Sequence, residues 1–150
     1  MKTCFFIGHR EADEQLNSKL EKIIKRLIIE EQVFCFYVGG YGGFDGVAAS
    51  AVKRLKQCYP QITLMLVLTY HPAERPAEIP PGFNGTYYPD GLEKVPRRFA
   101  ITRANEIMAR NCDWLVAYVC HGASNSGKIL DYAKRRGVSC ININELEEEE

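Results

Sequence analysis

The sequence predicts an α/β protein of three layers, in which helices cover both faces of a mainly parallel sheet of five strands. Two observations support this fold class. Short apolar segments alternate with amphipathic segments along the chain, an order that favours a parallel sheet. The apolar segments are also continuous runs rather than alternating patterns, as expected for strands covered on both faces.

The predicted strands are five apolar runs, at residues 3–7, 33–38, 62–68, 114–119 and 138–143. Between the first two, apolar residues recur at spacings of three and four from Leu16 to Ile28, which predicts an amphipathic helix of about four turns. A second helix is expected to follow Asp45 as its N-cap. Two more helices are expected, one that begins at Arg97 and one that ends at Gly137, a favoured residue after a helix.

Residues 69–96 are expected to form a long irregular loop, because six of the seven prolines lie between residues 72 and 96. Loops of this length are usually lids, binding loops or disordered segments. Residues 1–144 are expected to form one domain. Residues 145–150, which hold five glutamates, are expected to be a frayed acidic tail.

The composition is that of an average globular protein, with 46% hydrophobic and 25% charged residues. The 19 basic side chains balance 19 acidic ones, but five of the acidic ones lie in residues 145–150. No apolar run is long enough to span a membrane and no secretory signal is visible, so a cytoplasmic protein without a membrane partner is expected. The six cysteines form no Cys-x-x-Cys pair, and we predict no metal site.

Ligands of parallel α/β sheets bind outside the carboxyl ends of the strands. This rule selects residues 8–10, 39–45 and 120–128 before any motif is considered. The excess of basic residues before residue 145 favours an anionic small molecule in this place.

The segment from Gly39 to Gly46 holds five glycines in eight residues. Glycine permits a positive φ and a close approach of the backbone, and the start of the next helix favours an anion. The segment is not the dinucleotide fingerprint, because Asp45 stands where the third glycine belongs. Asp45 is expected to cap the helix or meet a sugar hydroxyl, and the alternative is a tight turn without a ligand. The expected ligand contacts here are Gly39, Gly40, Gly42, Gly43, Phe44 and Asp45.

The segment from Gly122 to Ile129 nearly matches a phosphate-binding loop, but Ile129 replaces the Ser or Thr that holds Mg²⁺. We therefore do not expect ATP hydrolysis. A second phosphate-cradling loop is predicted instead, and the alternative is an ordinary serine N-cap. The residues of this predicted loop are Gly122, Ser124, Ser126 and Gly127.

Residues Gly8, His9 and Arg10 end the first predicted strand. The fork of Arg10 fits a phosphate and His9 can form a hydrogen bond to it, whereas the alternative is a solvated arginine on a surface turn. Arg103 lies at the edge of an apolar helix stripe and therefore needs a counter-charge, either a phosphate or a carboxylate.

Tyr87 and Tyr88 lie in the proline-rich segment. An aromatic ring in such a loop can stack on a base, and it can equally pack in a core or an interface. The sequence leaves both alternatives open.

The run from Cys4 to Arg10, the glycine-rich segment followed by Val47-Ala48, and residues 105–113 resemble the SMF/DprA–LOG (SLOG) superfamily. The resemblance spans nearly the whole chain and is greatest to the small YpsA-like bacterial members. It implies a Rossmann-like fold that binds nucleotides or their derivatives, and Asn105 joins the expected ligand contacts. Within the superfamily, lonely-guy enzymes cleave the N-glycosidic bond of nucleoside monophosphates, and DNA-processing A proteins bind single-stranded DNA.

Two catalytic positions of the lonely-guy enzymes are not matched. Their Arg-Lys-x-x-Met motif, aligned on Met108, places Ala104 at the arginine, with Arg103 one residue away. Their Pro-Gly-Gly-x-Gly-Thr-x-x-Glu motif falls on residues 119–128, which hold no carboxylate. Because glycosidic cleavage needs a nearby carboxylate, Asp45 is the candidate catalytic residue.

The sequence favours a protein that binds a nucleotide or nucleotide derivative at the carboxyl ends of the strands, with a sensor role in view. A phosphoribohydrolase-like enzyme is the first alternative. A single-stranded DNA binder is the second alternative. It is ranked last because the charge is near neutral and the basic segments hold few aromatic residues. No cofactor beyond the nucleotide-type ligand is expected, and a homo-oligomer stays open.

Overall fold

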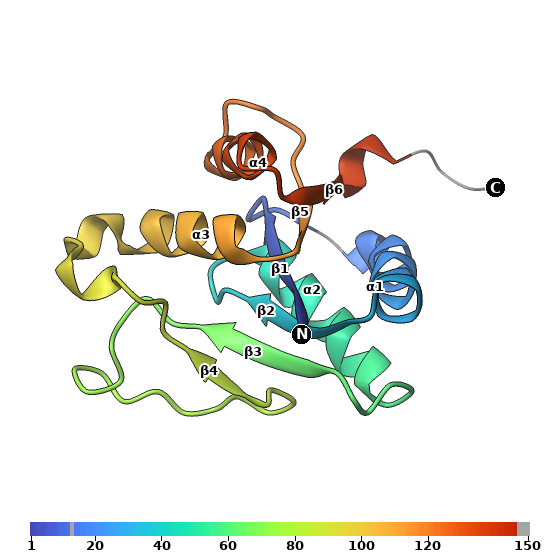
Figure 1. Ribbon diagram of the computed structural model, residues 1–150, viewed down its shortest axis with the longest axis horizontal. Helices are drawn as coiled ribbons and strands as arrows, with labels where there is room; N and C mark the ends of the chain where they lie inside the picture. The colour runs from blue at the N-terminus through green and yellow to red at the C-terminus, as the bar shows by residue number, and fades with distance from the viewer. Residues whose placement is uncertain (13, 147–150) are drawn as a thin grey trace.

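A six-stranded, fully parallel sheet forms the centre of the molecule in the computed structural model, which describes residues 1–12 and 14–146 (Figure 1). Its order is β4-β3-β2-β1-β5-β6, and in Figure 1 it runs from β4 at the bottom to β6 near the top. The strands are β1 (Lys2–Gly8), β2 (Val33–Val38), β3 (Thr63–Val67), β4 (Gly85–Tyr87), β5 (Trp114–Tyr118) and β6 (Ser139–Asn142). All five strand pairings are parallel.

Four helices cover the two faces of this sheet: α1 (Asn17–Glu31), α2 (Gly43–Lys56), α3 (Ala100–Asn111) and α4 (Asn125–Arg135). Short 3₁₀ turns lie at Glu14–Leu16, Leu92–Lys94, Arg97–Phe99 and Ile143–Glu145. Successive side chains of a strand point to opposite faces. Cys4 and Phe6 of β1 therefore pack with α1 and α2, whereas Phe5 and Ile7 pack with α3 and α4.

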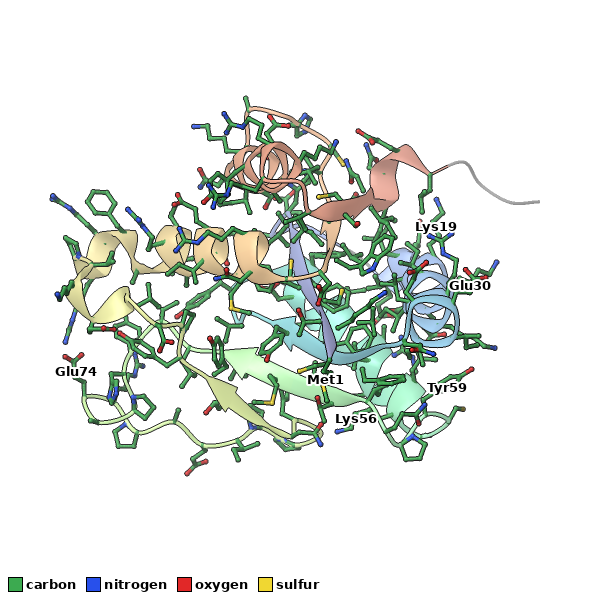
Figure 2. All side chains as sticks on the ribbon, viewed as in Figure 1. Met1, Lys19, Glu30, Lys56, Tyr59 and Glu74 are labelled. Atoms are coloured by element: carbon green, nitrogen blue, oxygen red, sulfur yellow. The ribbon has the colours of Figure 1, made fainter. Side chains whose placement is uncertain are left out.

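Side chains fill both spaces between the sheet and its helices, while labelled residues such as Lys19, Glu30 and Glu74 lie at the periphery (Figure 2). The largest fully buried side chains include Phe5, Phe6 and Phe36, all on the two central strands. The predicted α/β fold of three layers is confirmed, and the five predicted strands all exist.

The predicted number of strands was wrong by one, because residues 69–96 are not wholly irregular. Residues 85–87 form β4, which pairs with β3 from Met65 to Val67. A strand of three residues that begins with glycine and lies among prolines has no apolar pattern to reveal it. The β4 strand forms only because it pairs with β3, and the sequence alone does not show that these two segments lie side by side.

The two tyrosines of this segment contact other aromatic rings, although Tyr87 is exposed and Tyr88 is half-buried. The ring of Tyr87 lies edge-on to Tyr37 at 5.5 Å between centroids, and Tyr88 lies edge-on to His71 at 5.2 Å. Both rings thus have packing partners within the chain, and stacking of the exposed Tyr87 on a base stays a prediction. Of the expected acidic tail, residues 147–150 lie outside the described residues, and Glu145 ends a 3₁₀ turn.

Candidate functional site

A cavity of about 280 Å³ lies at the carboxyl end of β1, where the chain has neighbours from both halves of the sheet. The chain builds β2, β3 and β4 on one side of β1 and then crosses to build β5 and β6 on the other. Such a switch point leaves a crevice at the ends of the strands, because the connections diverge there. The lining residues are Phe6, Ile7, Gly8, His9, Arg10, Gly39, Tyr41, Asp45, Ile101, Asn105, Ser124, Asn125 and Ser126.

His9 joins the end of β1 to the loop after β5. The backbone N–H of Cys120 donates a 2.6 Å hydrogen bond to Nε2 of His9, and the N–H of His9 donates to the carbonyl of Tyr118 at 3.2 Å. A ring nitrogen that accepts a hydrogen bond carries no proton, so the ring proton of His9 lies on Nδ1. The His9 ring also lies edge-on to Tyr118, at 5.6 Å. His9 therefore fixes one wall of the cavity.

The glycines after β2 serve a close approach of two backbones. Gly42 has φ +131°, a value that favours glycine, and a Cβ on it would lie 3.2 Å from Arg10. The N–H of Gly43 donates to the carbonyl of Arg10 at 2.8 Å, and the N–H of Phe44 donates to the carbonyl of His9 at 3.3 Å. The first turn of α2 thus gives these two donors to the chain after β1. The N–H of Gly43, which was expected to contact a ligand, is thus used within the chain.

Phe44 was expected to contact the ligand, but its side chain is fully buried. Its ring packs with Phe6 at 6.5 Å and with Tyr118 at 6.0 Å, and it fills the space that a Cβ on Gly8 would occupy. Phe44 is a core residue beneath the cavity. Gly8 is required for this packing, and its backbone still lines the cavity above.

Asp45 lies in the cavity wall but does not cap α2, which begins at Gly43 after Gly42. One carboxylate oxygen of Asp45 accepts a 3.1 Å hydrogen bond from the N–H of Tyr41. That oxygen also stands over Gly39, where a Cβ would meet it at 3.2 Å. Burial raises the pKa of Asp45 to about 6, against the lowering effect of the Tyr41 hydrogen bond. The group can therefore gain or lose a proton near neutral pH.

The start of α4 forms the opposite wall. Ser124 is an N-cap: its hydroxyl accepts from the N–H of Gly127 at 3.0 Å and donates to the carbonyl of His121 at 2.6 Å. Gly127 packs directly on the carbonyl of Gly122, so a side chain does not fit there. Ser124 is therefore an N-cap that also lines the cavity, as does Ser126 in the first turn of α4.

The two predicted arginines have different surroundings. Arg10 lines the cavity and makes no ion pair with any described residue. Arg103 is absent from the lining, and its Nε lies 3.8 Å from a carboxylate oxygen of Glu106, one turn along α3. Arg103 was expected to face either a phosphate or a carboxylate, and here it faces the carboxylate of Glu106.

Eight of the expected ligand contacts meet at this cavity: Gly8, His9, Arg10, Gly39, Asp45, Asn105, Ser124 and Ser126. Gly40 lines a neighbouring hollow at the end of β3. Gly42, Gly43, Phe44, Gly122 and Gly127 shape the walls without lining them, and Arg103 lies outside.

Five lining residues were not among the expected contacts: Phe6, Ile7, Tyr41, Ile101 and Asn125. Tyr41 had a signal, since it lies inside the glycine segment, and its hydroxyl is 2.7 Å from that of Thr69. Asn125 stands at the first position of α4, beside the predicted Ser124. Ile101 had none, because an exposed apolar residue on a helix is ordinary.

The described residues contain no group of three His, Cys, Asp or Glu side chains that could hold a metal ion. No helix in this part of the chain has the length and apolar character needed to cross a membrane.

The architecture and cavity define a Rossmann-like α/β protein with a crevice at the carboxyl edge of its sheet. Comparison with protein-family models gives no match, and comparison with curated proteins gives none. Among solved structures, the chain is similar to DNA processing protein A (DprA) from Streptococcus pneumoniae, with a TM-score of 0.66 and 18% identity. The match covers 93% of this chain and 49% of that one, so this chain spans about half the length of DprA. The likeness shows a shared fold.

Proposed function

We propose that this protein is a distant member of the SLOG superfamily and binds a nucleotide or nucleotide derivative in the cavity at the end of β1. The observation that carries the proposal is the position of Arg10, which lines the cavity and forms no ion pair with a described residue. Arg10 and the first turn of α4 line the same space. An arginine fork and a helix N-terminus both favour a phosphate.

We expect the phosphate to lie against α4 rather than α2, because the N–H groups of Gly43 and Phe44 already donate to backbone carbonyls. Asn125 and Ser126 offer side-chain amide and hydroxyl groups on the α4 side. The sugar then lies toward Asp45, whose carboxyl group can accept hydrogen bonds from hydroxyl groups. A sensor role follows if binding is not accompanied by turnover.

A thermal-shift titration with AMP and with ribose 5-phosphate tests this proposal. A ligand at about 100 times its Kd adds about 2.7 kcal/mol of stability, which is about 5–10 °C for a domain of this size. Arg10→Ala should weaken both ligands by tenfold or more, since a hydrogen bond to a charged group contributes about 1.5–3 kcal/mol. Arg26→Ala, an exposed arginine on α1, is the matched control. Absence of any shift with either ligand would contradict the proposal.

A second candidate is an enzyme that cleaves the N-glycosidic bond of a nucleoside monophosphate, with Asp45 as its acid. The raised pKa of Asp45 and its place in the cavity favour this candidate. No carboxylate follows β5 before Asp131, so we expect little or no adenine when the protein is incubated with AMP. Robust release, measured by chromatography and lost in Asp45→Asn, would place the enzyme first.

Single-stranded DNA binding is the third candidate, and the name of the structural neighbour favours it. The guanidinium groups of Arg75 and Arg97 lie 5.2 and 5.8 Å from the ring of Tyr70. Arginine and aromatic groups together are typical of single-strand binding surfaces. Titration of a labelled oligonucleotide with AMP as competitor separates this candidate from the first, because the Tyr70 cluster is outside the cavity lining.

A further inference from the structure

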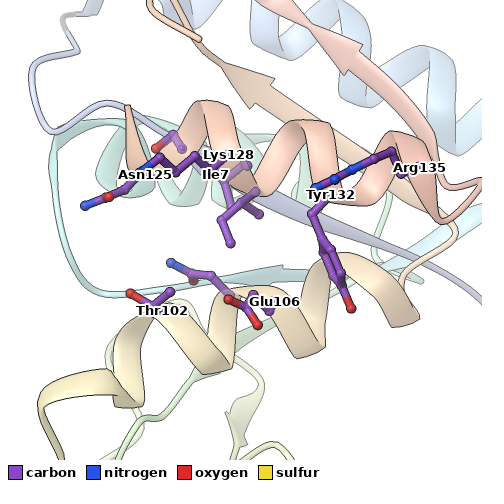
Figure 3. A pocket seen from close by; sticks show the side chains of 10 residues that line it. Ile7, Thr102, Glu106, Asn125, Lys128, Tyr132 and Arg135 are labelled. Atoms are coloured by element: carbon purple, nitrogen blue, oxygen red, sulfur yellow. The ribbon is translucent and has the colours of Figure 1, made fainter. Parts of the chain in front are cut away.

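A second hollow, of about 300 Å³, lies between α3 and α4 and is lined in part by residues of the cavity described above (Figure 3). Four residues line both spaces: Ile7, Asn105, Asn125 and Ser126. Ligand pockets usually have volumes of about 300–1,000 Å³, so each space alone is small for a nucleotide. Because the two spaces share a wall, one ligand that occupies both can place its phosphate and sugar in one and its base in the other.

The hollow exists because α3 packs on two different partners. Met108 and Ala109, near its end, belong to the core cluster that α4 shares through Leu130 and Ala133. Ala104, nearer its start, packs in a separate cluster with the 88–95 segment. The groove lies beside this shared cluster, and its lining runs along α4 from Asn125 to Arg135 and along α3 from Thr102 to Glu106.

The side chains of this groove combine apolar walls with hydrogen-bonding groups. Ile129 and the ring of Tyr132 come from α4, and in Figure 3 Tyr132 descends from that helix toward α3. Asn105 and Glu106 come from α3. Glu106 keeps one carboxylate oxygen beside Arg103 at 3.8 Å, so its other oxygen is available to a ligand. An aromatic face next to polar groups matches a heterocyclic base, which stacks on its face and forms hydrogen bonds at its edge.

We propose that the groove between α3 and α4 binds the base of the nucleotide, and that it selects a purine that carries an amino group. This inference rests on the proposed function, because the phosphate must lie near Arg10 and the start of α4. Tyr132 provides the stacking surface. Glu106 is the specificity-determining residue, because a carboxylate accepts hydrogen bonds from an amino group and repels a base edge that presents only acceptors.

The experiment is an isothermal titration with three probes: AMP, purine riboside 5′-monophosphate, which lacks the amino group, and ribose 5-phosphate, which lacks the base. Wild-type protein should bind AMP about tenfold or more tightly than purine riboside 5′-monophosphate, the usual effect of one hydrogen bond to a charged group. Glu106→Ala should reduce this ratio to below threefold and leave ribose 5-phosphate binding unchanged. Glu106→Gln should retain part of the ratio, because its amide oxygen still accepts. Glu30→Ala, on the exposed side of α1, is the control.

Stacking is tested separately. Tyr132→Phe should preserve AMP affinity within about threefold, whereas Tyr132→Ala should weaken AMP and purine riboside 5′-monophosphate by about tenfold each and spare ribose 5-phosphate. The binding of ribose 5-phosphate also shows that each variant is folded.

Two results overturn the inference in distinguishable ways. If ribose 5-phosphate and AMP bind but neither the Glu106 nor the Tyr132 variants change the ratios, the base lies elsewhere and the phosphate site stands. If neither probe binds the wild-type protein, the proposed function fails and the base subsite fails with it.

Discussion

Asp45→Asn is expected to make the protein more stable at neutral pH, although it removes a charged residue from the candidate site. The asparagine has nearly the same shape, and its Oδ1 can still accept the hydrogen bond from the N–H of Tyr41. What the substitution removes is a carboxylate that folding takes partly out of water. Burial of a charge costs free energy unless a partner compensates it, and one backbone N–H is the only donor to Asp45 among the described residues.

The magnitude follows from the pKa of Asp45, which is about 6 in the folded protein against an ordinary value of 3.8. At 1.36 kcal/mol for each pKa unit, this difference corresponds to about 3 kcal/mol, and about 2 kcal/mol remains after allowance for solvent contact. The folded state binds the proton more tightly than the unfolded state. The wild-type protein therefore loses this stability as the pH rises from about 4 through about 6. The side chain of Asn at position 45 does not titrate, so the variant keeps this stability as the pH rises.

Thermal melts at intervals from pH 4 to pH 8, in buffers without phosphate, measure the effect. The two proteins should melt together near pH 4, and Asp45→Asn should melt about 4–8 °C higher at pH 7.5. Asp90→Asn, at an exposed loop position, controls for the loss of one negative charge. A constant difference between the Asp45→Asn and wild-type melting temperatures across this range would refute the reasoning.

Three further substitutions test the walls of the cavity. Gly8→Ala should lower the free energy of unfolding by about 1–3 kcal/mol in urea titrations, because its methyl group overlaps the ring of Phe44. Gly42→Val should abolish ribose 5-phosphate binding with the helical circular dichroism signal retained, since a side chain at φ +131° displaces Arg10; normal binding would contradict this. Arg103→Ala should change stability by less than about 1 kcal/mol and leave ribose 5-phosphate affinity unchanged, because its ion pair is exposed. A tenfold weaker titration would return Arg103 to the phosphate site.

The fold class was predictable because its signals are local. The run from Cys4 to Ile7 is apolar without alternation, and the structure covers both of its faces. The spacing from Leu16 to Ile28 marks α1 because 3.6 residues per turn place those side chains on one face. The β4 strand was not predictable, because three residues carry no periodicity and their pairing is decided by a neighbour some 20 residues away in the chain.

The location of the cavity was predictable in the same way, since the ends of parallel strands meet at one edge whatever the details of packing. Which backbone N–H groups remain free to bind a ligand was not predictable. The sequence shows that residues 39–46 are rich in glycine, but a backbone N–H can serve a phosphate or another carbonyl with the same local pattern. Only the tertiary structure brings the carbonyl of Arg10 to the N–H of Gly43. Likewise, the groove beside Tyr132 depends on where α3 packs. Local sequence determines which segments form helices and strands, and contacts between distant segments determine which polar groups remain free to bind.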